Sequence, residues 1–183
     1  LMAEVILSNR MQALTDMVTP GTVITDVGCD HGFVSVYLVQ KGISPRAIAM
    51  DVRSGPLEHA REHIREYGLE DRIETRLSDG LHSLKTGEAA GMICAGMGGP
   101  LMEKILTEGR EQAKGFRELI LQPQSEIPHF RTFLMEEGYL LMDEIENHFN
   151  KEIVSTLIRF FMDGKINKNG KAEYIERVAN VTK

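Results

Sequence analysis

Acidic residues follow three apolar segments that read as β-strands, and this spacing points to one binding site. Asp26 and Asp30 lie in the run Asp26-Val-Gly28-Cys-Asp30-His31-Gly32, Asp51 closes a second apolar segment, and Asp79 follows a third. Ligands of open α/β sheets bind outside the carboxyl ends of the strands, so these acids converge on one crevice. Any one of them alone is more often a helix cap or a turn residue. Together they predict a ligand-binding site.

The turn after the first of these segments distinguishes between two classes of nucleotide cofactor. A dinucleotide fingerprint that begins at Gly28 requires glycines at the two positions that Asp30 and Phe33 occupy. A carboxylate at position 30 also repels the pyrophosphate that binds at such a helix N-terminus. S-adenosylmethionine (SAM) carries a sulfonium and an ammonium group and no phosphate, so acids attract it. We therefore predict SAM as the cofactor, held at this turn by Asp26, Gly28, Asp30, His31 and Gly32.

The later strand ends supply the remaining predicted cofactor contacts, which include Ala95 and Gly96 at the end of the fourth strand. Asp51, with Val52 beside it, is placed to accept hydrogen bonds from ribose hydroxyls. Asp79 is placed to accept the adenine amino group, and Gly80 to border the ring. His31 is a single histidine in a cofactor turn, where a structural hydrogen bond is commoner than a role as general base.

The loop Ala95-Gly96-Met97-Gly98-Gly99-Pro100 is predicted to face the methyl acceptor. It contains no acid, base or nucleophile, so its glycines would bring backbone groups close to the acceptor, while Pro100 suits a first helical turn. Two alternatives stay open, a tight turn and a phosphate-binding nest. Gln122 is predicted to hydrogen-bond the acceptor base. The residues predicted to take part in catalysis are Asp26, Gly96, Met97, Gly98 and Gln122. They would stabilise the positive charge that develops on the acceptor.

These residues need a βαβ framework to position them, and the hydropathy pattern predicts one. Five apolar segments are predicted as buried parallel strands: Thr22–Val27, Ala47–Asp51, Arg72–Leu77, Gly91–Ala95 and Glu118–Gln122. Helices are predicted at Ser8–Val18, Gly32–Gln40, Ser54–Tyr67, Leu101–Glu108, Pro128–Glu137 and Lys171–Val181. Tyr139–Glu146 and Glu152–Phe161, joined by a short polar turn, predict an antiparallel hairpin. The expected fold is α/β and Rossmann-like, with a mostly parallel sheet that ends in this hairpin.

Composition limits the class of protein. The chain has 183 residues, 42% hydrophobic and 26% charged, as in a globular domain. No apolar run approaches the ~20 residues that span a bilayer, and the first residues do not read as a signal peptide, so we expect a cytoplasmic protein. Cys29 and Cys94 are expected to be buried free thiols. The histidines lack metal-ligand spacing, and no metal is predicted.

Charge is distributed unevenly along the chain. The net charge is -6, but residues 151–183 contain 7 basic and 4 acidic residues, against 14 basic and 23 acidic in residues 1–150. The basic segment is compatible with a polyanionic partner and equally with a solvated surface. We expect a principal domain at residues 1–163 and a short helical extension at 164–183.

Four motifs, in this order, resemble the bacterial tRNA (adenine-N1)-methyltransferases that modify adenine 22. They are Ile6-Leu-Ser-Asn-Arg10, the turn Asp26–Gly32, Ala95-Gly-Met-Gly-Gly99 and Leu119-Ile-Leu-Gln-Pro123. The resemblance covers roughly residues 6–162 and implies a SAM-dependent Rossmann-type domain, tRNA as partner, and methyl transfer to N1 of a flipped-out adenine. It also places Arg10 beside the site, against the SAM carboxylate or an RNA phosphate.

The resemblance also implies a helical, coiled-coil-like C-terminal domain that helps to hold tRNA. Only twenty residues follow Asp163, which is too short for the paired helices of such a domain. Two other functions fit the sequence: a SAM-dependent methyltransferase of another acceptor, and a non-catalytic nucleotide- or RNA-binding Rossmann module. The sequence itself sets neither the acceptor atom nor the oligomeric state.

Overall fold

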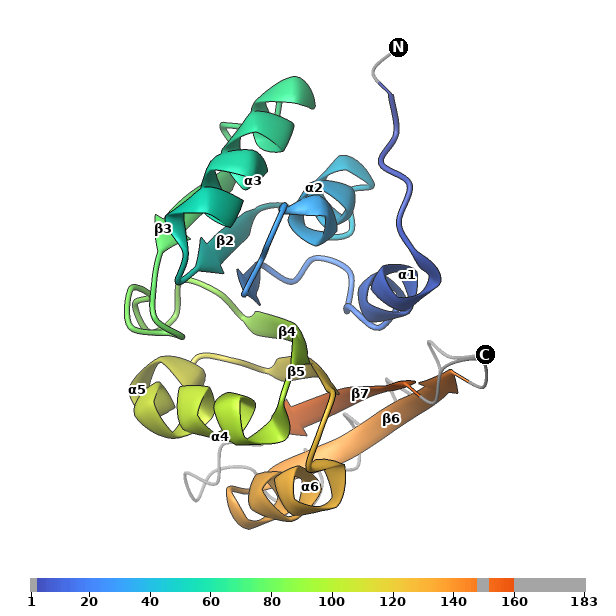
Figure 1. Ribbon diagram of the computed structural model, residues 1–183, viewed down its shortest axis with the longest axis vertical. Coiled ribbons are helices and arrows are strands. Elements are labelled where there is room, and N and C mark those ends of the chain that lie inside the picture. The colour runs from blue at the N-terminus through green and yellow to red at the C-terminus, as the bar shows by residue number, and fades with distance from the viewer. Residues whose placement is uncertain (1–2, 148–151, 160–183) are drawn as a thin grey trace.

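The computed structural model describes residues 3–147 and 152–159, which form one twisted sheet with helices on both faces (Figure 1). The strands are β1 (Ile24–Val27), β2 (Ala47–Asp51), β3 (Ile73–Leu77), β4 (Gly91–Met97), β5 (Glu118–Pro123), β6 (Tyr139–Asn147) and β7 (Glu152–Arg159). The helices are α1 (Asn9–Asp16), α2 (Phe33–Gln40), α3 (Ser54–Glu66), α4 (Gly99–Glu108), α5 (Arg110–Ala113) and α6 (Ile127–Glu136).

The strand order confirms the predicted sheet. The seven strands run β3-β2-β1-β4-β5-β7-β6; β1 to β5 are parallel, while β7 is antiparallel to both β5 and β6. β7 lies between β5 and β6, so the second strand of the hairpin, and not the first, extends the parallel sheet. Sequence periodicity predicted the hairpin but did not determine which of its strands would be inside.

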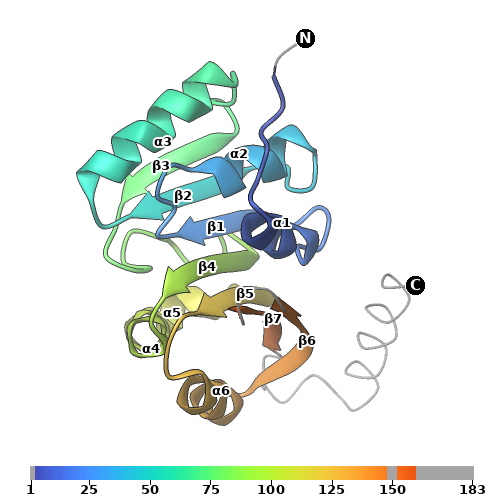
Figure 2. The ribbon, with the colours of Figure 1, turned by 45° about the vertical axis from the view of Figure 1, so that its right-hand side comes forward.

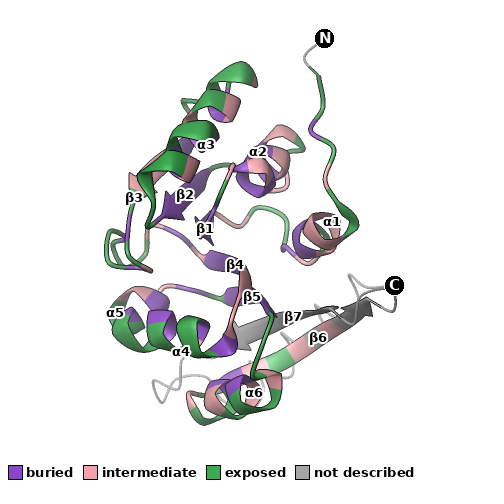
Figure 3. Cartoon of the chain, in the orientation of Figure 1, coloured by how far each residue is buried: buried purple, intermediate pink, exposed green. Residues whose placement is uncertain are grey.

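The central strands are apolar because helices cover both of their faces. Every residue of β1, β2 and β5 is buried, and these strands are purple in Figure 3. β3 stands at the sheet edge, where Ile73 is buried and Glu74 is exposed. Strands buried on both faces lose the alternation of polar and apolar residues, which is the pattern that predicted a parallel sheet.

The helices divide into two groups. In Figures 1 and 2, α1, α2 and α3 gather on one side of the sheet, and α4, α5 and α6 on the other. Each group encloses its own core, with Val36, Leu57 and Ala60 under the first and Met102, Phe116 and Phe130 under the second. The neighbouring strands β1 and β4 are followed by helices on opposite faces of the sheet, α2 and α4 respectively. The carboxyl ends of these two strands form the topological switch point at which open α/β sheets bind ligands.

Hydrogen bonds join the N-terminal segment, which precedes β1, to the start of β5. Ser8 caps α1 by accepting a hydrogen bond from the Met11 N–H at 3.3 Å. The Glu118 carboxylate, buried at the start of β5, accepts the Thr19 N–H at 3.0 Å and the Thr19 hydroxyl at 2.7 Å. Burial raises the pKa of Glu118, partly offset by these hydrogen bonds. The segment that carries Arg10 therefore has a fixed position.

The predicted elements agree with the observed ones to within three residues where the structure describes them, with one addition. The short helix α5 was not predicted, because four residues are too few to show a hydrophobic period. The hairpin turn, the last two residues predicted for its second strand, the helix at Lys171–Val181 and the extension at 164–183 lie outside the described residues. Within residues 3–147 and 152–159, no helix is long and apolar enough to cross a membrane.

Candidate active site

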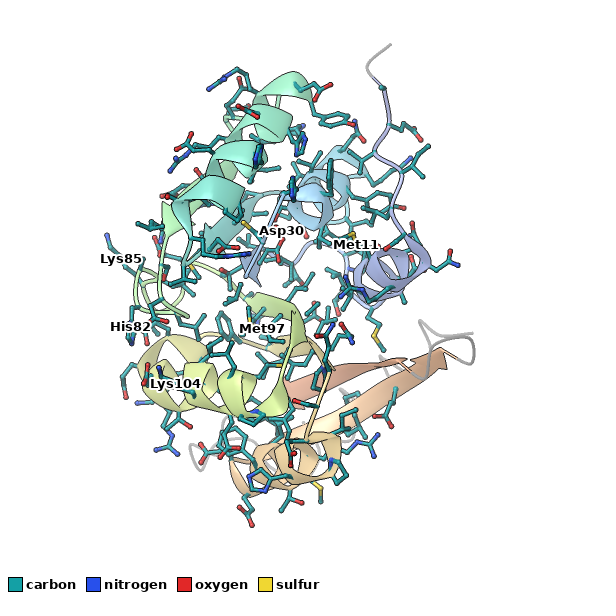
Figure 4. The ribbon with its side chains drawn as sticks, viewed as in Figure 1. Met11, Asp30, His82, Lys85, Met97 and Lys104 are labelled. Atoms are coloured by element: carbon teal, nitrogen blue, oxygen red, sulfur yellow. The ribbon has the colours of Figure 1, made fainter. Side chains whose placement is uncertain are left out.

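A cavity of about 590 Å³ opens at the carboxyl ends of β1, β2 and β4 and beside the loop after β3. It is bounded by α1, the turn after β1 and the end of β4, from which Met11, Asp30 and Met97 come (Figure 4). Its walls include most of the residues predicted for the site: Arg10, Asp26, Gly28, Asp30, His31, Asp51, Val52, Asp79, Gly80, Ala95, Gly96 and Met97. Three strand ends far apart in sequence therefore build one cavity, as the spacing of the acids predicted.

The charge of this cavity is negative. Four aspartates line it, at positions 26, 30, 51 and 79, against two arginines, at positions 10 and 53. A concave site with an excess of carboxylates raises the local concentration of cations and repels phosphates. The cavity therefore favours a cationic ligand over a dinucleotide.

Asp26 is the most perturbed acid of the site. Its side chain is 5% exposed at the carboxyl end of β1, and one carboxylate oxygen accepts a hydrogen bond from the Ser35 hydroxyl at 3.0 Å. The pKa of Asp26 is raised to about 7, mainly by burial; the Ser35 hydrogen bond lowers it, and the negative charges of Asp51 and Asp30 contribute to the rise. A cation in the cavity would stabilise the ionised carboxylate and lower this pKa.

Asp51 organises the turn that precedes α2. Its buried carboxylate accepts the backbone N–H of Asp30 at 3.2 Å and that of Arg53 at 2.9 Å. Asp30 itself has a φ of 49°, in the left-handed region that glycine usually occupies. The bond to Asp51 helps to hold this conformation, and the Asp30 side chain, 57% exposed, projects beside the cavity with Arg53 at 4.0 Å.

The His31 ring belongs to a stack of aromatic rings. It lies parallel to Phe33 and to His59, with ring centroids 6.2 and 5.1 Å away. Its backbone carbonyl is 2.9 Å from Nδ1 of His63, and Phe33 stacks on the same His63 ring. These contacts support the structural interpretation of His31. The part of the chain that the structure describes contains no group of three or more metal-ligating side chains.

Both cysteines are buried free thiols, as predicted. Burial raises the pKa of Cys94 to about 12 and that of Cys29 well above its usual value. The Cys94 sulfur lies 3.6 Å from the Met97 sulfur. Because the thiolate is the reactive form, neither cysteine is arranged as a nucleophile.

The wall formed by β4 and β5 is held by hydrogen bonds of Gln122. Its side-chain oxygen accepts both the Gly96 N–H and an N–H of Arg10, each at 3.0 Å. Gly96 has a φ of 74°, and a Cβ atom there would lie 3.2 Å from Nη1 of Arg10. Glycine at this position therefore lets the Arg10 side chain from α1 cross the loop.

Close packing explains the other glycines of the two loops. A Cβ atom on Gly28, whose φ is 73°, would lie 2.3 Å from Cε of Met97. Cβ atoms on Gly98 and Gly99 would lie 2.8 and 2.6 Å from Ser125, in the loop that leads to α6. The glycines therefore also allow close packing between loops, a role that was not predicted from the sequence.

Three predicted site residues lie outside the described lining of the cavity: Gly32, Gly98 and Gln122. Gly32 is the N-cap residue of α2, where a Cβ atom would lie 3.0 Å from that of Ala60 in α3. Gly98 packs against Ser125, and Gln122 is 1% exposed. All three support the walls, and a direct contact with a ligand stays a prediction for each.

The structure adds three residues that sequence reasoning did not select. Ser35 binds Asp26, Arg53 binds Asp51, and Gln124 lines the cavity beside Gly96. Ser35 was detectable as a polar residue within the apolar run of α2, and Arg53 by its place directly after a strand-end acid. Gln124 had no such signal, since polar residues are ordinary in loops.

Comparison with known proteins agrees with this geometry. A family model described as a methyltransferase domain matches residues 7–154. The chain belongs to this methyltransferase family.

Two of the similar proteins are described as tRNA methyltransferases. The tRNA (adenine(22)-N(1))-methyltransferase of Bacillus subtilis strain 168 is 38% identical over 144 residues, which are 79% of this chain and 60% of the relative. The crystal structure of the B. subtilis m1A22 tRNA methyltransferase matches with a TM-score of 0.79 and 32% identity, over 91% of this chain and 73% of that one. The motif resemblance is thereby confirmed.

A third relative carries a cofactor. A putative tRNA (m1A22) methyltransferase of Streptococcus pneumoniae, in complex with S-adenosyl-L-methionine, matches with a TM-score of 0.80 and 30% identity over 89% of this chain and 77% of that one. The chain spans about 60% of the length of its curated B. subtilis relative.

Proposed function

We propose that the chain is a SAM-dependent methyltransferase that modifies N1 of adenine 22 in tRNA. The observation that carries this proposal is a cavity at the topological switch point with four carboxylates and two guanidinium groups. SAM is cationic at its reacting centre, so such a cavity attracts it. The similarity to tRNA (adenine(22)-N(1))-methyltransferases supports the choice of acceptor.

The donor set of the cavity fits SAM. Its volume of about 590 Å³ is within the range of about 300–1,000 Å³ usual for small-molecule sites. Asp51 would bind the ribose, while Asp79, Gly80 and Val52 would surround the adenine. Gly28 would let the cofactor approach the turn, and the buried Asp26 carboxylate would balance its positive charge.

The residues of this chain mainly position the reactants. Bound SAM would supply a methyl group to adenine N1 by direct displacement: the C–S bond would break as the N–C bond forms, and the electron pair of the broken bond would stay on sulfur. No side chain needs to act as nucleophile, and both cysteines stay protonated. Asp26 and the backbone carbonyls near Gly96 and Met97 would ease the positive charge that develops on the base. Proximity and orientation supply most of the remaining rate.

The proposed partner is tRNA, which places the activity in the cytoplasm. Residues 164–183 would be a short version of, or the first part of, a helical domain that contacts tRNA. The basic character of residues 151–183 supports contact with a polyanion.

The test is incubation with methyl-labelled SAM and two tRNA transcripts that differ only in having adenine or guanine at position 22. We expect label in the first transcript alone, and a primer-extension stop at position 22, because an N1-methyl group blocks Watson–Crick pairing. Label in both transcripts would contradict the assignment of the position.

Calorimetry examines the cofactor separately. We expect SAM to bind and NAD not to bind. Tight binding of NAD without binding of SAM would overturn the methyltransferase proposal itself.

A further inference from the structure

Two glutamines near the carboxyl end of β5 have different surroundings. Gln122 is the one whose sequence position predicted contact with the acceptor base. Its side chain is 1% exposed, and its oxygen already accepts hydrogen bonds from Arg10 and Gly96 at 3.0 Å. Gln122 is therefore part of the wall behind the acceptor loop.

Gln124 lies on the cavity side of this wall. It is exposed, follows the last residue of β5 and lines the cavity together with Gly96 and Met97. Its backbone N–H donates to the Met97 carbonyl at 2.8 Å, which fixes the residue to the acceptor loop. Its side-chain nitrogen lies 3.8 Å from where a Cβ atom on Gly96 would stand. No hydrogen bond to the Gln124 side-chain amide occurs among the described residues.

The proposed reaction restricts how adenine is recognised. N1 must keep its lone pair for the methyl group, so a donor placed on N1 would block the reaction. The Hoogsteen edge remains available, where N7 accepts a hydrogen bond and the N6 amino group donates one. A glutamine amide matches this edge with its NH₂ group on N7 and its oxygen on the N6 amino group. Guanine presents two acceptors there, N7 and O6, so the amide oxygen would face a carbonyl oxygen.

We propose that Gln124 is the specificity-determining residue for the acceptor, binding the Hoogsteen edge of adenine and leaving N1 free. This inference rests on the proposed function. It transfers the base contact predicted for Gln122 to the neighbouring glutamine whose amide faces the cavity.

The experiment combines variants of Gln124 with one atomic change in the substrate. A synthetic tRNA carries adenine or 7-deazaadenine at position 22, and 7-deazaadenine lacks the N7 acceptor but keeps N1 and the amino group. For the unchanged protein we expect kcat/KM to fall about fivefold with 7-deazaadenine. For Gln124→Leu we expect a fall of about 5- to 150-fold with adenine, the range of a bidentate amide–adenine pair, and no further fall with 7-deazaadenine.

Gln124→Glu makes the test sharper. The carboxylate keeps an acceptor for the amino group but opposes the N7 lone pair with negative charge. We therefore expect this variant to methylate 7-deazaadenine faster than adenine, the reverse of the unchanged protein. A variant that had lost its fold would lose activity on both substrates and would not reverse their order.

Gln112→Leu is the matched control, since it makes the same change in α5, away from the cavity. We expect it to retain the preference of the unchanged protein for adenine. SAM affinity by calorimetry should stay the same in Gln124→Leu and Gln112→Leu, which leave the charge of the cavity unchanged.

Two outcomes separate the inference from the function on which it rests. If the unchanged protein methylates adenine 22 but the effect of 7-deazaadenine is the same in Gln124→Leu, the assignment of Gln124 is wrong and the proposed function stands. If the unchanged protein binds SAM but transfers no methyl group to adenine 22, the proposed function is wrong, and the assignment with it.

Discussion

The two halves of the cavity are built by different means. The half at β1, β2 and β3 carries the acids Asp26, Asp51 and Asp79 on the strand ends or directly after them. The half at β4 and β5 carries glycines and the Gln124 amide, and Gln122 behind it joins this wall to Arg10 of α1. Charge dominates the first half, while backbone approach and neutral hydrogen bonds dominate the second.

This difference matches the ligands proposed for each half. A cationic cofactor is held by carboxylates, whereas a neutral base that must present a free lone pair is better held by neutral groups beside it. If this division is correct, changes in the acidic half should alter SAM binding, and changes in the glycine half should alter turnover of tRNA.

The largest effect is expected for Asp26→Asn, which removes the buried charge and keeps the shape. We expect methylation of a tRNA transcript to fall about 100-fold or more, because preorganised charge near a reacting centre contributes that much to catalysis. Calorimetry should show weaker SAM binding in the same variant. An unchanged rate and SAM affinity would exclude Asp26 from the cofactor half.

The thermal stability of Asp26→Asn is the control for this variant, because we expect it to rise while the activity falls. The folded-state pKa of Asp26 is raised from 3.8 to about 7. Its contribution to stability is therefore complete below about pH 4 and is lost as the pH rises through about 7. Asp26→Asn should thus have a higher Tm than the unchanged protein at pH 8, and a smaller difference at pH 5. Lower stability at pH 8 would indicate that the carboxylate is needed for folding.

The next effect is expected for Gly28→Ala. The added Cβ atom would lie 2.3 Å from Cε of Met97, so one of the two must move into the cavity. We expect SAM affinity by calorimetry to fall roughly 30-fold, which corresponds to the ~2 kcal/mol that an extra methyl group costs in a packed site.

Gly42→Ala is its matched control. Gly42 has a φ of 68°, close to the 73° of Gly28, but a Cβ atom there meets nothing within 4 Å. Both variants carry the same backbone strain, of about 1–2 kcal/mol, and only Gly28→Ala should lose SAM affinity. Equal losses would mean that strain, and not space, is the cause.

A smaller effect is expected for Arg10→Ala, which tests the boundary between the halves. Loss of the Arg10–Gln122 hydrogen bond should lower turnover of tRNA about tenfold, the equivalent of one charge-assisted hydrogen bond. SAM affinity should change less, since the partner of Arg10 lies in the glycine half. A greater loss in SAM affinity than in turnover would instead place Arg10 against the cofactor, one of the two roles predicted for it from the sequence.

The smallest effect is the pH dependence of cofactor binding. Ionised Asp26 should bind the cation better than protonated Asp26, and its pKa is about 7. Between pH 7.5 and pH 6 we expect SAM affinity to weaken about fivefold in the unchanged protein. The same titration should be flat in Asp26→Asn, and a parallel slope there would assign the pH dependence to another group.

Much of the fold was predictable because its signals are local. Runs such as Ala47–Asp51 and Glu118–Gln122 are apolar on both faces, and glycines mark the ends of the helices between them. The position of β7 between β5 and β6 was not predictable, since either strand of a hairpin could pair with β5 and satisfy the same pattern. The helix α5 was too short to show a period.

For the site, the sequence by itself determined the positions of the acids. Asp26, Asp51 and Asp79 could be predicted to meet because parallel strands bring their carboxyl ends to one edge of the sheet. The four motifs, the glycine turn among them, also indicated the family, because such motifs depend only on residue types and on their order along the chain.

Only the tertiary structure decided which side chains face the cavity. Gln122 in β5 and Gln124 just after β5 are two residues apart, yet the first is buried and bonded to Arg10 and Gly96, whereas the second lines the cavity. The raised pKa of Asp26 likewise depends on burial and on the negative charges of Asp51 and Asp30. Orientation and burial arise from contacts between segments far apart in the chain, and local sequence does not contain them.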